Sequence, residues 1–382
     1  MKPHPIPSTM PCRYFGVCGG CDSQDIPYPE QLKIKEARVK EMFSSVDAGS
    51  MEDIVPSPEI FYYRNKMEYA VSGDNGEALI GLRQKKRFYR TVDLEECPIF
   101  FDGVSDVFKV FKAWMKKNDI EPYQLRRHSG SVRYAAMRHS KRYNELMVIA
   151  VMARAEATIG ELVDGLDKIE AVKSVYMCVN DAVADVSTAG RITLMSGQEH
   201  IKENINGIDY LVGPDSFFQT NPYCCDRLYG VIKERTKGVG GTALDMCCGS
   251  GGITLQVAGN FDKVIGVDIS AKNIENALLN ARINKRDNVE FVCQDAEKFV
   301  PGENLSTIIL DPPRAGLGKK AKKWVLESGV ENVVYVSCNP VNLAQDLTAL
   351  KEAYKIKSLI PVDMFPHTRH LEVVAILKRD KV

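Results

Sequence analysis

Apolar strands alternate with helical stretches from Thr242 onward, and this alternation constrains the fold more than any other feature. The strands read TALDM, KVIGVDIS, VEFVCQD, STIILDPP and NVVYVSC, and the last of them ends at Cys338. Continuous apolar strands separated by helices form a parallel sheet that is covered on both faces. The final run, HLEVVAILKR, follows KSLIPVDMFPHT too closely for a helical crossover, so we expect it to pair antiparallel.

The pattern divides the 382 residues into three parts. Residues 1–58 hold three clustered cysteines and are too few for a core of their own. Residues 59–204 alternate short strands with helices, which predicts an α+β middle domain. Residues 205–382 begin with a hairpin about Asn206-Gly207 and continue as an α/β domain. Helices are expected at about 30–43, 104–117 and 158–169.

Composition argues against membrane and secreted classes. The chain is 45% hydrophobic and 26% charged, and no apolar stretch approaches the roughly 20 residues that a membrane span needs. The first residues, MKPHPIPSTMPC, lack the apolar core of a signal peptide. We therefore expect a cytoplasmic protein, with a monomer favoured. Its eleven cysteines should bind metal or do chemistry rather than form disulfides.

Positive charge is concentrated in the middle domain, although the chain has 50 Lys and Arg against 50 Asp and Glu. The runs GLRQKKRFYR (81–90) and LRRHSGSVRYAAMRHSKR (125–142) contain no acidic residue. They interleave the aromatic residues Phe88, Tyr89 and Tyr134 with the basic ones. Such runs can follow a phosphate backbone and stack on unpaired bases. Solvated strand faces would explain them equally well.

A glycine-rich turn, LDMCCGSGGIT, joins the first strand of the sheet to its helix. Gly249 and Gly251 let a ligand approach the backbone and the helix N-terminus, but position 254 is Thr where a dinucleotide fingerprint needs glycine. Asp268 ends the next strand, where an acidic residue typically binds the ribose hydroxyls of an adenosine cofactor. Asp295 ends the third strand and either binds the adenine amino group or serves as a turn aspartate.

Acidic residues and one cysteine end the parallel strands. Ligands of open α/β sheets bind beyond the carboxyl ends of the strands, so these side chains should converge at one edge. They are Asp245, Asp268, Asp295, Asp311 and Cys338. The antiparallel final strand begins at the same edge, which predicts that Glu372 and Cys338 are neighbours.

Cys338, in VVYVSCNP, is either a nucleophile or an inert core residue. A free thiol has a pKa of about 8.5 and is mostly protonated at neutral pH. Pro340 fits the first turn of a following helix, whose N-terminus should favour the thiolate. We therefore expect the site to activate its own nucleophile.

Several motifs together resemble the S-adenosylmethionine-dependent RNA uracil-5-methyltransferases. They are FFQTN, the glycine loop, LDPPRAGL, VVYVSCNP and FPHTRHLE, and with CRYFGVCGGC the resemblance extends from Cys12 to Glu372. It implies a class I methyltransferase sheet that is Rossmann-like and has one antiparallel final strand. It also implies S-adenosylmethionine as cofactor and a structured RNA as substrate. Among RNAs we favour 23S ribosomal RNA, with transfer RNA next.

The resemblance also implies roles for single residues. Cys338 would add to carbon 6 of uracil as the nucleophile, and Glu372 would remove the proton from carbon 5. The residues that would contact the cofactor or the target base are Gln219, Cys247, Gly249, Gly251, Asp268, Asp295 and Asp311.

Three cysteines, Cys12, Cys18 and Cys21, lie close together near the start of the chain. Their spacing alone permits either a zinc site or a 4Fe-4S cluster. The resemblance implies the 4Fe-4S cluster and identifies Cys97, in EECPIF, as the fourth ligand. The cluster would fasten the N-terminal segment to the middle domain, as a structural or RNA-positioning element.

Three other classes of protein remain open. A methyltransferase acting on an exocyclic amino group would keep the cofactor residues and DPPR, but it has no use for Cys338. A nicotinamide-dependent oxidoreductase explains the glycine loop and Asp268, but not the basic middle domain or Gln219. A noncatalytic iron-sulfur RNA-binding protein leaves the strand-end residues unexplained.

Overall fold

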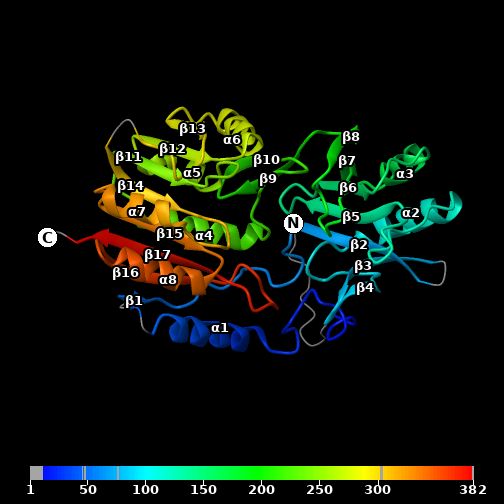
Figure 1. Ribbon diagram of the computed structural model, residues 1–382, viewed down its shortest axis with the longest axis horizontal. Coiled ribbons are helices and arrows are strands. Elements are labelled where there is room, and N and C mark those ends of the chain that lie inside the picture. Colours follow the sequence, from blue (N-terminus) through cyan, green and yellow to red (C-terminus); the bar gives the residue numbers. More distant parts are fainter. Residues whose placement is uncertain (1–11, 45, 47–48, 75–76, 302–303, 381–382) are drawn as a thin grey trace. The chain divides into compact units, whose positions relative to one another are not determined.

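The chain forms two compact units in the computed structural model, which describes residues 12–44, 46, 49–74, 77–301 and 304–380 (Figure 1). The first unit comprises the residues up to Pro27, Glu59–Glu203 and Val212–Asp215. The second unit comprises Tyr28–Pro58, Asn204–Leu211 and Ser216–Val382. The stretch 1–58, treated above as one segment, is therefore divided between the two units after Pro27.

An eight-stranded mixed sheet forms the centre of the second unit, in the order β1-β16-β17-β15-β14-β11-β12-β13. The strands are β1 (Ser50–Met51), β11 (Thr242–Met246), β12 (Lys263–Asp268), β13 (Val289–Cys293), β14 (Leu305–Leu310), β15 (Asn332–Ser337), β16 (Tyr354–Val362) and β17 (Glu372–Arg379). Strands β11 to β15 pair parallel, whereas β17 pairs antiparallel with β15 and β16. The expected parallel sheet with an antiparallel final strand is confirmed. Strand β1, which pairs parallel with β16, was not anticipated.

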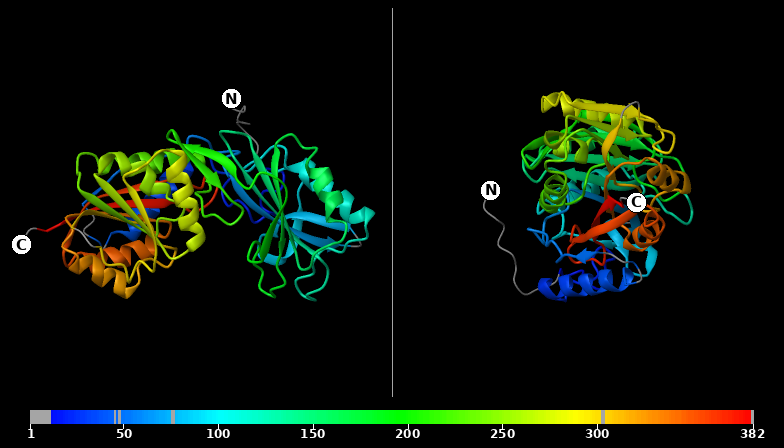
Figure 2. Two further views of the ribbon diagram at one scale, coloured as in Figure 1. Left: turned by 90° about the horizontal axis from the view of Figure 1, so that it is seen from above. Right: turned by 90° about the vertical axis from the view of Figure 1, so that its left-hand side faces the viewer.

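Helices cover both faces of this sheet (Figures 1 and 2). The helices are α1 (Tyr28–Met42), α4 (Pro222–Arg235), α5 (Gly252–Val257), α6 (Ala271–Ile283), α7 (Lys319–Glu327), α8 (Pro340–Leu350) and a 3₁₀ turn at Ala258–Asn260. Helices α1, α7 and α8 share one face and its core, while α4, α5 and α6 lie on the other. Local signals start the helices: the Asn221 side chain accepts from the backbone N–H of Cys224, and Pro222 and Pro340 occupy first turns.

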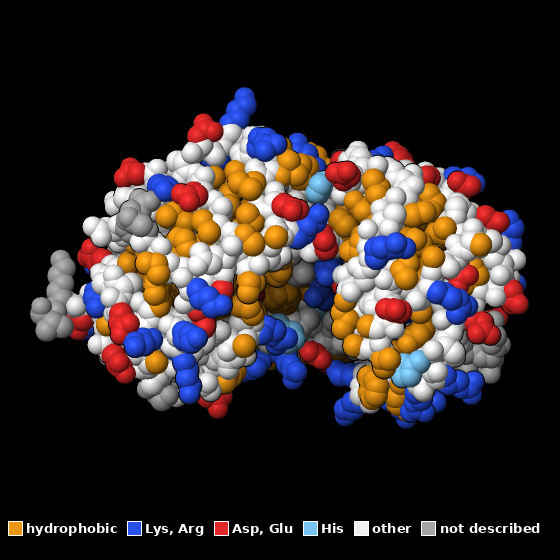
Figure 3. Space-filling view, turned by 45° about the horizontal axis from the view of Figure 1, so that its top comes forward, with side chains coloured by type: hydrophobic (Ala, Val, Ile, Leu, Met, Phe, Trp, Pro, Cys, Tyr) orange, Lys and Arg blue, Asp and Glu red, His pale blue; other side chains and the backbone are white. Residues whose placement is uncertain are grey.

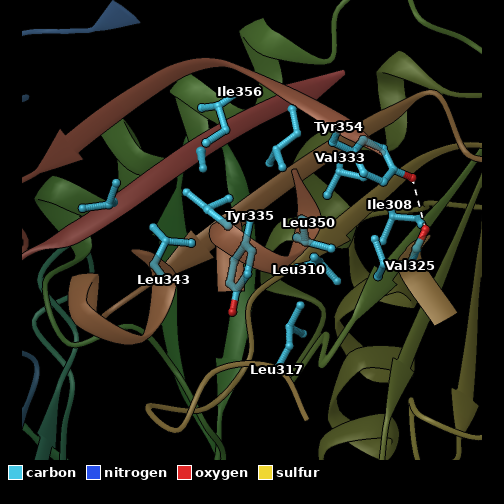
Figure 4. Close-up of a cluster of buried hydrophobic side chains, with 14 of the residues drawn as sticks. Ile308, Leu310, Leu317, Val325, Val333, Tyr335, Leu343, Leu350, Tyr354 and Ile356 are labelled. Carbon is cyan, nitrogen blue, oxygen red and sulfur yellow. Dashed lines mark hydrogen bonds between the residues drawn. The ribbon is translucent and has the colours of Figure 1, made fainter. Parts of the chain in front are cut away.

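The core beneath α7 and α8 is closely packed around two tyrosines (Figure 4). Leu343 and Leu350 of α8 are fully buried against the strand residue Tyr335 and its neighbours. The Tyr354 hydroxyl donates to the Val325 carbonyl at 3.2 Å, which satisfies a polar group that would otherwise be buried without a partner. This core supports the strand ends at which the site lies.

A seven-stranded sheet, in the order β4-β3-β2-β5-β6-β7-β8, forms the first unit. The strands are β2 (Lys66–Asp74), β3 (Glu77–Gln84), β4 (Arg87–Asp93), β5 (Val132–His139), β6 (Leu146–Met152), β7 (Val172–Val179) and β8 (Arg191–Gly197). Its helices are α2 (Val104–Lys117) and α3 (Ile159–Leu166), close to the predicted ranges. Only β6 and β7 pair parallel, on either side of α3, so the α+β character expected of this region is observed.

The predicted hairpin is present as β9 (Ile201–Ile205) and β10 (Ile208–Val212). Asn206 and Gly207 have φ angles of 49° and 80°, the left-handed conformation that a tight hairpin turn requires. Among the described residues, no helix combines the length and the apolar character needed to cross a membrane.

Candidate functional site

The strand-end residues lie where the topology predicts, at the carboxyl edge of the sheet in the second unit. Asp268 is the last residue of β12, and Asp311 and Cys338 directly follow β14 and β15. Asp245 lies within β11, one residue before its end, and Asp295 lies two residues beyond β13. The structure therefore brings these five positions to one edge, although their chain separations span almost a hundred residues.

Cys338 and Glu372 are brought together by the register of the last strands. Ser337 of β15 pairs with Val373 of β17 in an antiparallel ladder. Continuing this register by one residue beyond β15 places Cys338 opposite Glu372, where side chains of the two strands share one face. The Glu372 carboxylate is close enough to influence the ionisation of the Cys338 thiol.

The Cys338 thiol is half-buried, and its surroundings oppose ionisation. Burial raises its pKa to about 11, and the nearby carboxylates of Glu372 and Asp311 act in the same direction. The Arg314 guanidinium lowers this pKa, but by less. The expected activation by the N-terminus of α8 is therefore not seen in this pKa, which burial and two negative charges raise.

Two carboxylates lie beside the cysteine: Glu372, which is buried, and Asp311, which is half-buried. Burial raises the pKa of Asp311 to about 7, and the charge of Asp245 adds to this effect. Burial also raises the pKa of Glu372 well above its ordinary value, with a further contribution from Asp311. A carboxylate that holds its proton so firmly is a stronger base once ionised than one in water.

Arg314 lies in the site but is not among the residues predicted from the sequence. Its guanidinium favours the ionised forms of both Cys338 and Glu372. Its carbonyl oxygen accepts hydrogen bonds from the side chains of Asn339 (3.1 Å) and Asn342 (2.8 Å), which fix the loop against α8. The signal in the sequence was a cation three residues after the strand-end Asp311.

Two glycines shape the turn between β11 and α5. Gly249 and Gly251 have φ angles of 54° and 81°, which disfavour any other residue, and a Cβ on Gly251 would lie 3.0 Å from the Phe291 ring. Asp268 holds this turn because its Oδ2 accepts from the N–H of Gly249 at 3.0 Å. Its Oδ1 accepts from the Ser270 N–H and the Asn273 side chain. A carboxylate can accept about four hydrogen bonds, so one position remains for a ribose hydroxyl.

A small pocket, with a cavity volume of about 20 Å³, lies beside this turn. Gln219, Cys247 and Asp311 line it together with Asp245. Asp245 Oδ2 accepts from the Thr254 hydroxyl at 2.5 Å, whereas its buried Oδ1 has no hydrogen-bond partner within the described part of the chain. Burial raises the pKa of Asp245 to about 7. A ligand that donates a hydrogen bond would satisfy this oxygen.

Asp295 occupies a surface turn at the rim of the same edge. Its carboxylate accepts from the backbone N–H of Glu297 at 3.0 Å and lies 3.3 Å from the Lys298 ammonium. The backbone hydrogen bond and the Lys298 charge lower its pKa. Its charge reaches Cys247, so the two predicted cofactor residues lie near each other.

The four predicted metal-binding cysteines converge within the first unit. Hydrogen bonds from Gly19 to Arg83 and from Lys85 to Val17 hold the cysteine segment along the end of β3. Burial raises the pKa of all four thiols. The charges of Cys97, Cys18 and Cys12 raise the pKa of Cys21 further, and those of Cys18 and Cys12 raise the pKa of Cys97. As placed, however, no group of three or more His, Cys, Asp or Glu side chains among the described residues could hold a metal ion. The cluster therefore stays a prediction.

Basic residues surround two aromatic side chains of β4 in the first unit. We call this surface the basic edge. The basic edge comprises Lys86, Arg87, Phe88, Tyr89, Arg90, Arg126 and Arg127. Phe88 is 74% exposed, and the Arg126 guanidinium stacks over the Tyr89 ring at 4.0 Å. The strand bulges here, since Arg87 pairs with Gln84 but Thr91 pairs with Arg83. In the described part of the chain, none of its five cations has an ion-pair partner. Figure 3 shows Lys and Arg side chains gathered along the lower margin of this unit.

Part of the second basic run, residues 125–142, faces inward, which corrects its interpretation as a continuous surface. Tyr134 is buried and donates a hydrogen bond to Asp185. The Arg133 guanidinium is also buried and donates to the carbonyl groups of Asn180, Ala182 and Ala184. Both belong to β5, which is buried throughout, so only the two ends of this run, at 126–129 and at Arg142, are exposed.

Comparison with known proteins identifies the family. A family model described as tRNA (Uracil-5-)-methyltransferase matches residues 27–380. A tRNA (uracil(54)-C(5))-methyltransferase of Pyrococcus furiosus is 36% identical over 379 residues, which cover 99% of this chain and 87% of the relative. The chain belongs to the tRNA (uracil-5-)-methyltransferase family. The resemblance drawn from the motifs is confirmed, and the chain is an RNA (uracil-5-)-methyltransferase.

Two further proteins are similar to this methyltransferase over most of its length. An uncharacterised RNA methyltransferase of Clostridium acetobutylicum is 34% identical over 381 residues, with 96% of this chain and 83% of the relative covered. The crystal structure of a Pyrococcus abyssi tRNA (uracil-54, C5)-methyltransferase, solved with S-adenosyl-L-homocysteine, superposes with a TM-score of 0.82 at 33% identity. That match covers 95% of this chain and 86% of the other, so the expected methyltransferase fold is confirmed.

Proposed function

We propose that this enzyme uses S-adenosylmethionine to methylate carbon 5 of a uridine in transfer RNA. The observation that carries the proposal is that the Cys338 thiol and the Glu372 carboxylate lie close to each other and to Asp311, which lines the pocket of the glycine turn. The curated relatives are named for uracil 54 of transfer RNA. We therefore propose the equivalent uridine as the target, in place of the 23S ribosomal RNA that the motifs led us to favour.

The hydrogen-bonding groups around the glycine turn suit the proposed cofactor. Asp268 has one acceptor position left for a ribose hydroxyl, and Asp245 Oδ1 can accept from a ligand donor. Bound S-adenosylmethionine would supply an activated methyl group. The other residues that we propose contact the cofactor or the target base are Gln219, Cys247, Gly249, Gly251, Asp295 and Asp311.

The chemistry of uracil explains why a thiol and a carboxylate are needed together. Carbon 5 is a weak nucleophile until the Cys338 sulfur bonds to carbon 6 and the electrons of the double bond move toward oxygen 4. Carbon 5 can then accept the methyl group. Glu372 takes the proton from carbon 5, the double bond forms again, and the carbon–sulfur bond breaks to return the thiolate.

Two substitutions test this scheme. Cys338→Ala should abolish both methylation and a covalent complex with a transfer RNA transcript, whereas Glu372→Gln should let that complex accumulate. The measurements are denaturing gel electrophoresis and identification of the methylated nucleoside after digestion. Cys178→Ala, a buried thiol of the first unit, serves as the control. An active Cys338→Ala enzyme, or a product methylated on an amino group, would contradict the proposal.

We also propose that Cys12, Cys18, Cys21 and Cys97 hold a 4Fe-4S cluster. Their convergence and the four-thiol donor set support this, since such clusters are bound by cysteine thiolates. Binding requires the side chains to turn toward a common centre. We expect anaerobically purified protein to contain iron and sulfide, and Cys97→Ala to lose both while Cys178→Ala keeps them. Zinc without iron would contradict the assignment.

The basic edge is the proposed RNA contact of the first unit. Its unpaired cations would neutralise phosphates, and the exposed Phe88 and Tyr89 rings would stack on unpaired bases. An enzyme that acts on carbon 5 must unstack its target, so unpaired nucleotides are present near the site when it works.

A further inference from the structure

Helix α1 buries two polar side chains against the loop that joins β16 to β17. Gln31 and Lys35 are 2% and 3% exposed, although both side chains are normally found at the surface. The Lys35 ammonium lies 2.6 Å from Asp363 Oδ1 and donates to the Phe365 carbonyl at 3.0 Å. The Gln31 amide accepts from the backbone N–H of His367 at 2.9 Å and contacts its ring Nδ1 at 3.1 Å.

The same loop is held from its other sides. Asn221, which caps α4, donates to the Met364 carbonyl at 3.0 Å, and the Cys224 thiol contacts the Asp363 carbonyl at 3.3 Å. The backbone N–H of Asp363 donates to Val55. His367 has a φ angle of 64°, which a residue other than glycine adopts only where its surroundings impose it.

The loop leads directly to the proposed base. It leaves β16 at Val362 and returns at Glu372, and these two residues pair with each other across the strands. The loop therefore ends at the residue pair that holds the Glu372 end of β17. The Glu372 side chain is 4% exposed, so it has little freedom to compensate for a shift of the loop.

A buried ion pair such as Lys35–Asp363 is a poor source of stability, because removal of two charges from water cancels most of their attraction. What it supplies is a fixed geometry, since the ammonium also binds a loop carbonyl. No step of the proposed reaction uses α1 directly. The contacts of Gln31 and Lys35, and that of Arg38 with the Arg369 carbonyl, all end on the segment immediately before Glu372.

We propose that Gln31, Lys35 and Asp363 are positioning residues that hold the Glu372 carboxylate opposite Cys338 for removal of the carbon 5 proton. The inference rests on the proposed function. It adds that a helix more than 300 residues upstream controls the last chemical step. Bond formation by Cys338 depends on β15 and α8 instead, so α1 should affect release of the product from the enzyme and not formation of the covalent complex.

The test uses the full chain, S-adenosylmethionine and a transfer RNA transcript that carries tritium on carbon 5 of uridine. Gln31→Ala and the double variant Lys35→Met with Asp363→Asn are compared with wild type; the double variant leaves no buried charge without a partner. Lys33→Met is the matched control, because Lys33 lies on the exposed side of the same helix. Single-turnover measurements give the rate of formation of the covalent complex and the rate of tritium release, and thermal unfolding checks the fold.

We expect both variants to form the covalent complex at a rate close to that of wild type, and to release tritium about 10- to 100-fold more slowly. A displacement of about 1 Å can cost about 100-fold in rate. Lys33→Met should match wild type in both rates. Wild-type release rates in the folded variants would overturn the inference, and so would an equal loss of both rates, which indicates a structural role only. If the double variant does not fold, Gln31→Ala decides. If wild type forms no covalent complex, the proposed function itself fails.

Discussion

Among single residues, Cys338 shows how a side chain's surroundings can oppose what its neighbours in sequence indicate. The helix that follows it begins at Pro340 as expected, and its N-terminus carries only about half a positive charge. Burial and the carboxylates of Glu372 and Asp311 nevertheless raise the thiol pKa to about 11. A thiol with this pKa is mostly protonated at neutral pH. Neutralisation of the neighbouring carboxylates would favour the thiolate.

The pH dependence of alkylation tests this ionisation directly. Because the thiolate reacts and its fraction rises tenfold for each pH unit below the pKa, modification of Cys338 by iodoacetamide should still accelerate above about pH 9. Glu372→Gln removes one of the opposing charges and should move the rise to lower pH. Mass spectrometry of the peptides that contain Cys338 and the exposed Cys293 compares the alkylation rates of the two thiols in the same sample. A rate at Cys338 that levels off by about pH 8 would contradict the raised pKa.

Residue positions could be predicted where they follow from topology, but not where they depend on burial. Cys338 and Glu372 could be placed together because strand order and direction fix which ends meet. Tyr134 was misjudged because its strand is buried on both faces, which the surrounding basic residues conceal. The influence of Arg314 on the ionisation of Cys338 and Glu372 could not be predicted. It depends on how the loop of Arg314 folds back onto α8.

Among the elements, α8 fixes the loop that carries Asp311 and Arg314. Asp346 of this helix accepts hydrogen bonds from the Tyr335 hydroxyl at 2.6 Å and from the Leu317 N–H at 2.9 Å. The Lys322 ammonium of α7 lies 2.9 Å from its other oxygen. One buried carboxylate thus joins α7, α8, β15 and the loop, so the edge of the site is supported from behind.

Removal of this carboxylate should weaken the whole unit. Asp346→Ala leaves the Tyr335 hydroxyl and a backbone N–H buried without partners, and we expect the free energy of unfolding to fall by about 2–3 kcal/mol. Urea unfolding measures this loss. Glu327→Ala breaks an exposed ion pair of α7 with Lys323 and should change the free energy by less than about 1 kcal/mol. Equal stability of the two variants would contradict the role of Asp346.

Helices and strands could largely be predicted because their signals are local. The hairpin at Asn206-Gly207 and the helix at Val104–Lys117 follow from turn chemistry and apolar periodicity. Strand β1 has only two residues and pairs with β16 far along the chain, so no local pattern announces it. Helix α1 could be predicted, but the burial of Gln31 and Lys35 could not. It depends on partners in a loop more than 300 residues away.

Over the whole molecule, a net charge of zero conceals a basic surface. The cations of the basic edge lie in one unit, whereas the carboxylates of the pocket lie in the other. Phosphate contacts are weakened by salt and are insensitive to sequence, while ring stacking persists at higher salt. The basic edge combines both kinds of contact, so its residues should differ in their response to ionic strength.

Salt titrations of transfer RNA binding separate the two contributions. Phe88→Ala should cost about 1–3 kcal/mol of binding free energy at every salt concentration, as expected for the loss of one stacked base. Arg126→Ala should reduce the slope of log affinity against log salt by about one. Lys109→Ala, on the exposed face of α2 and paired with Asp106, should leave both quantities unchanged. Unaltered binding by both basic-edge variants would remove this surface from the RNA contact.

The discontinuous make-up of the second unit has a consequence for synthesis of the protein on the ribosome. Ser50 of β1 pairs with Ser358 of β16, and Lys35 pairs with Asp363. At about 5–20 residues per second, the nascent chain waits roughly 15 to 60 seconds between the emergence of such partners. During that interval the first unit can complete its own sheet, while α1 keeps its buried face exposed. Translation speed and chaperone capture of this early helix therefore become determinants of how much active enzyme a cell obtains.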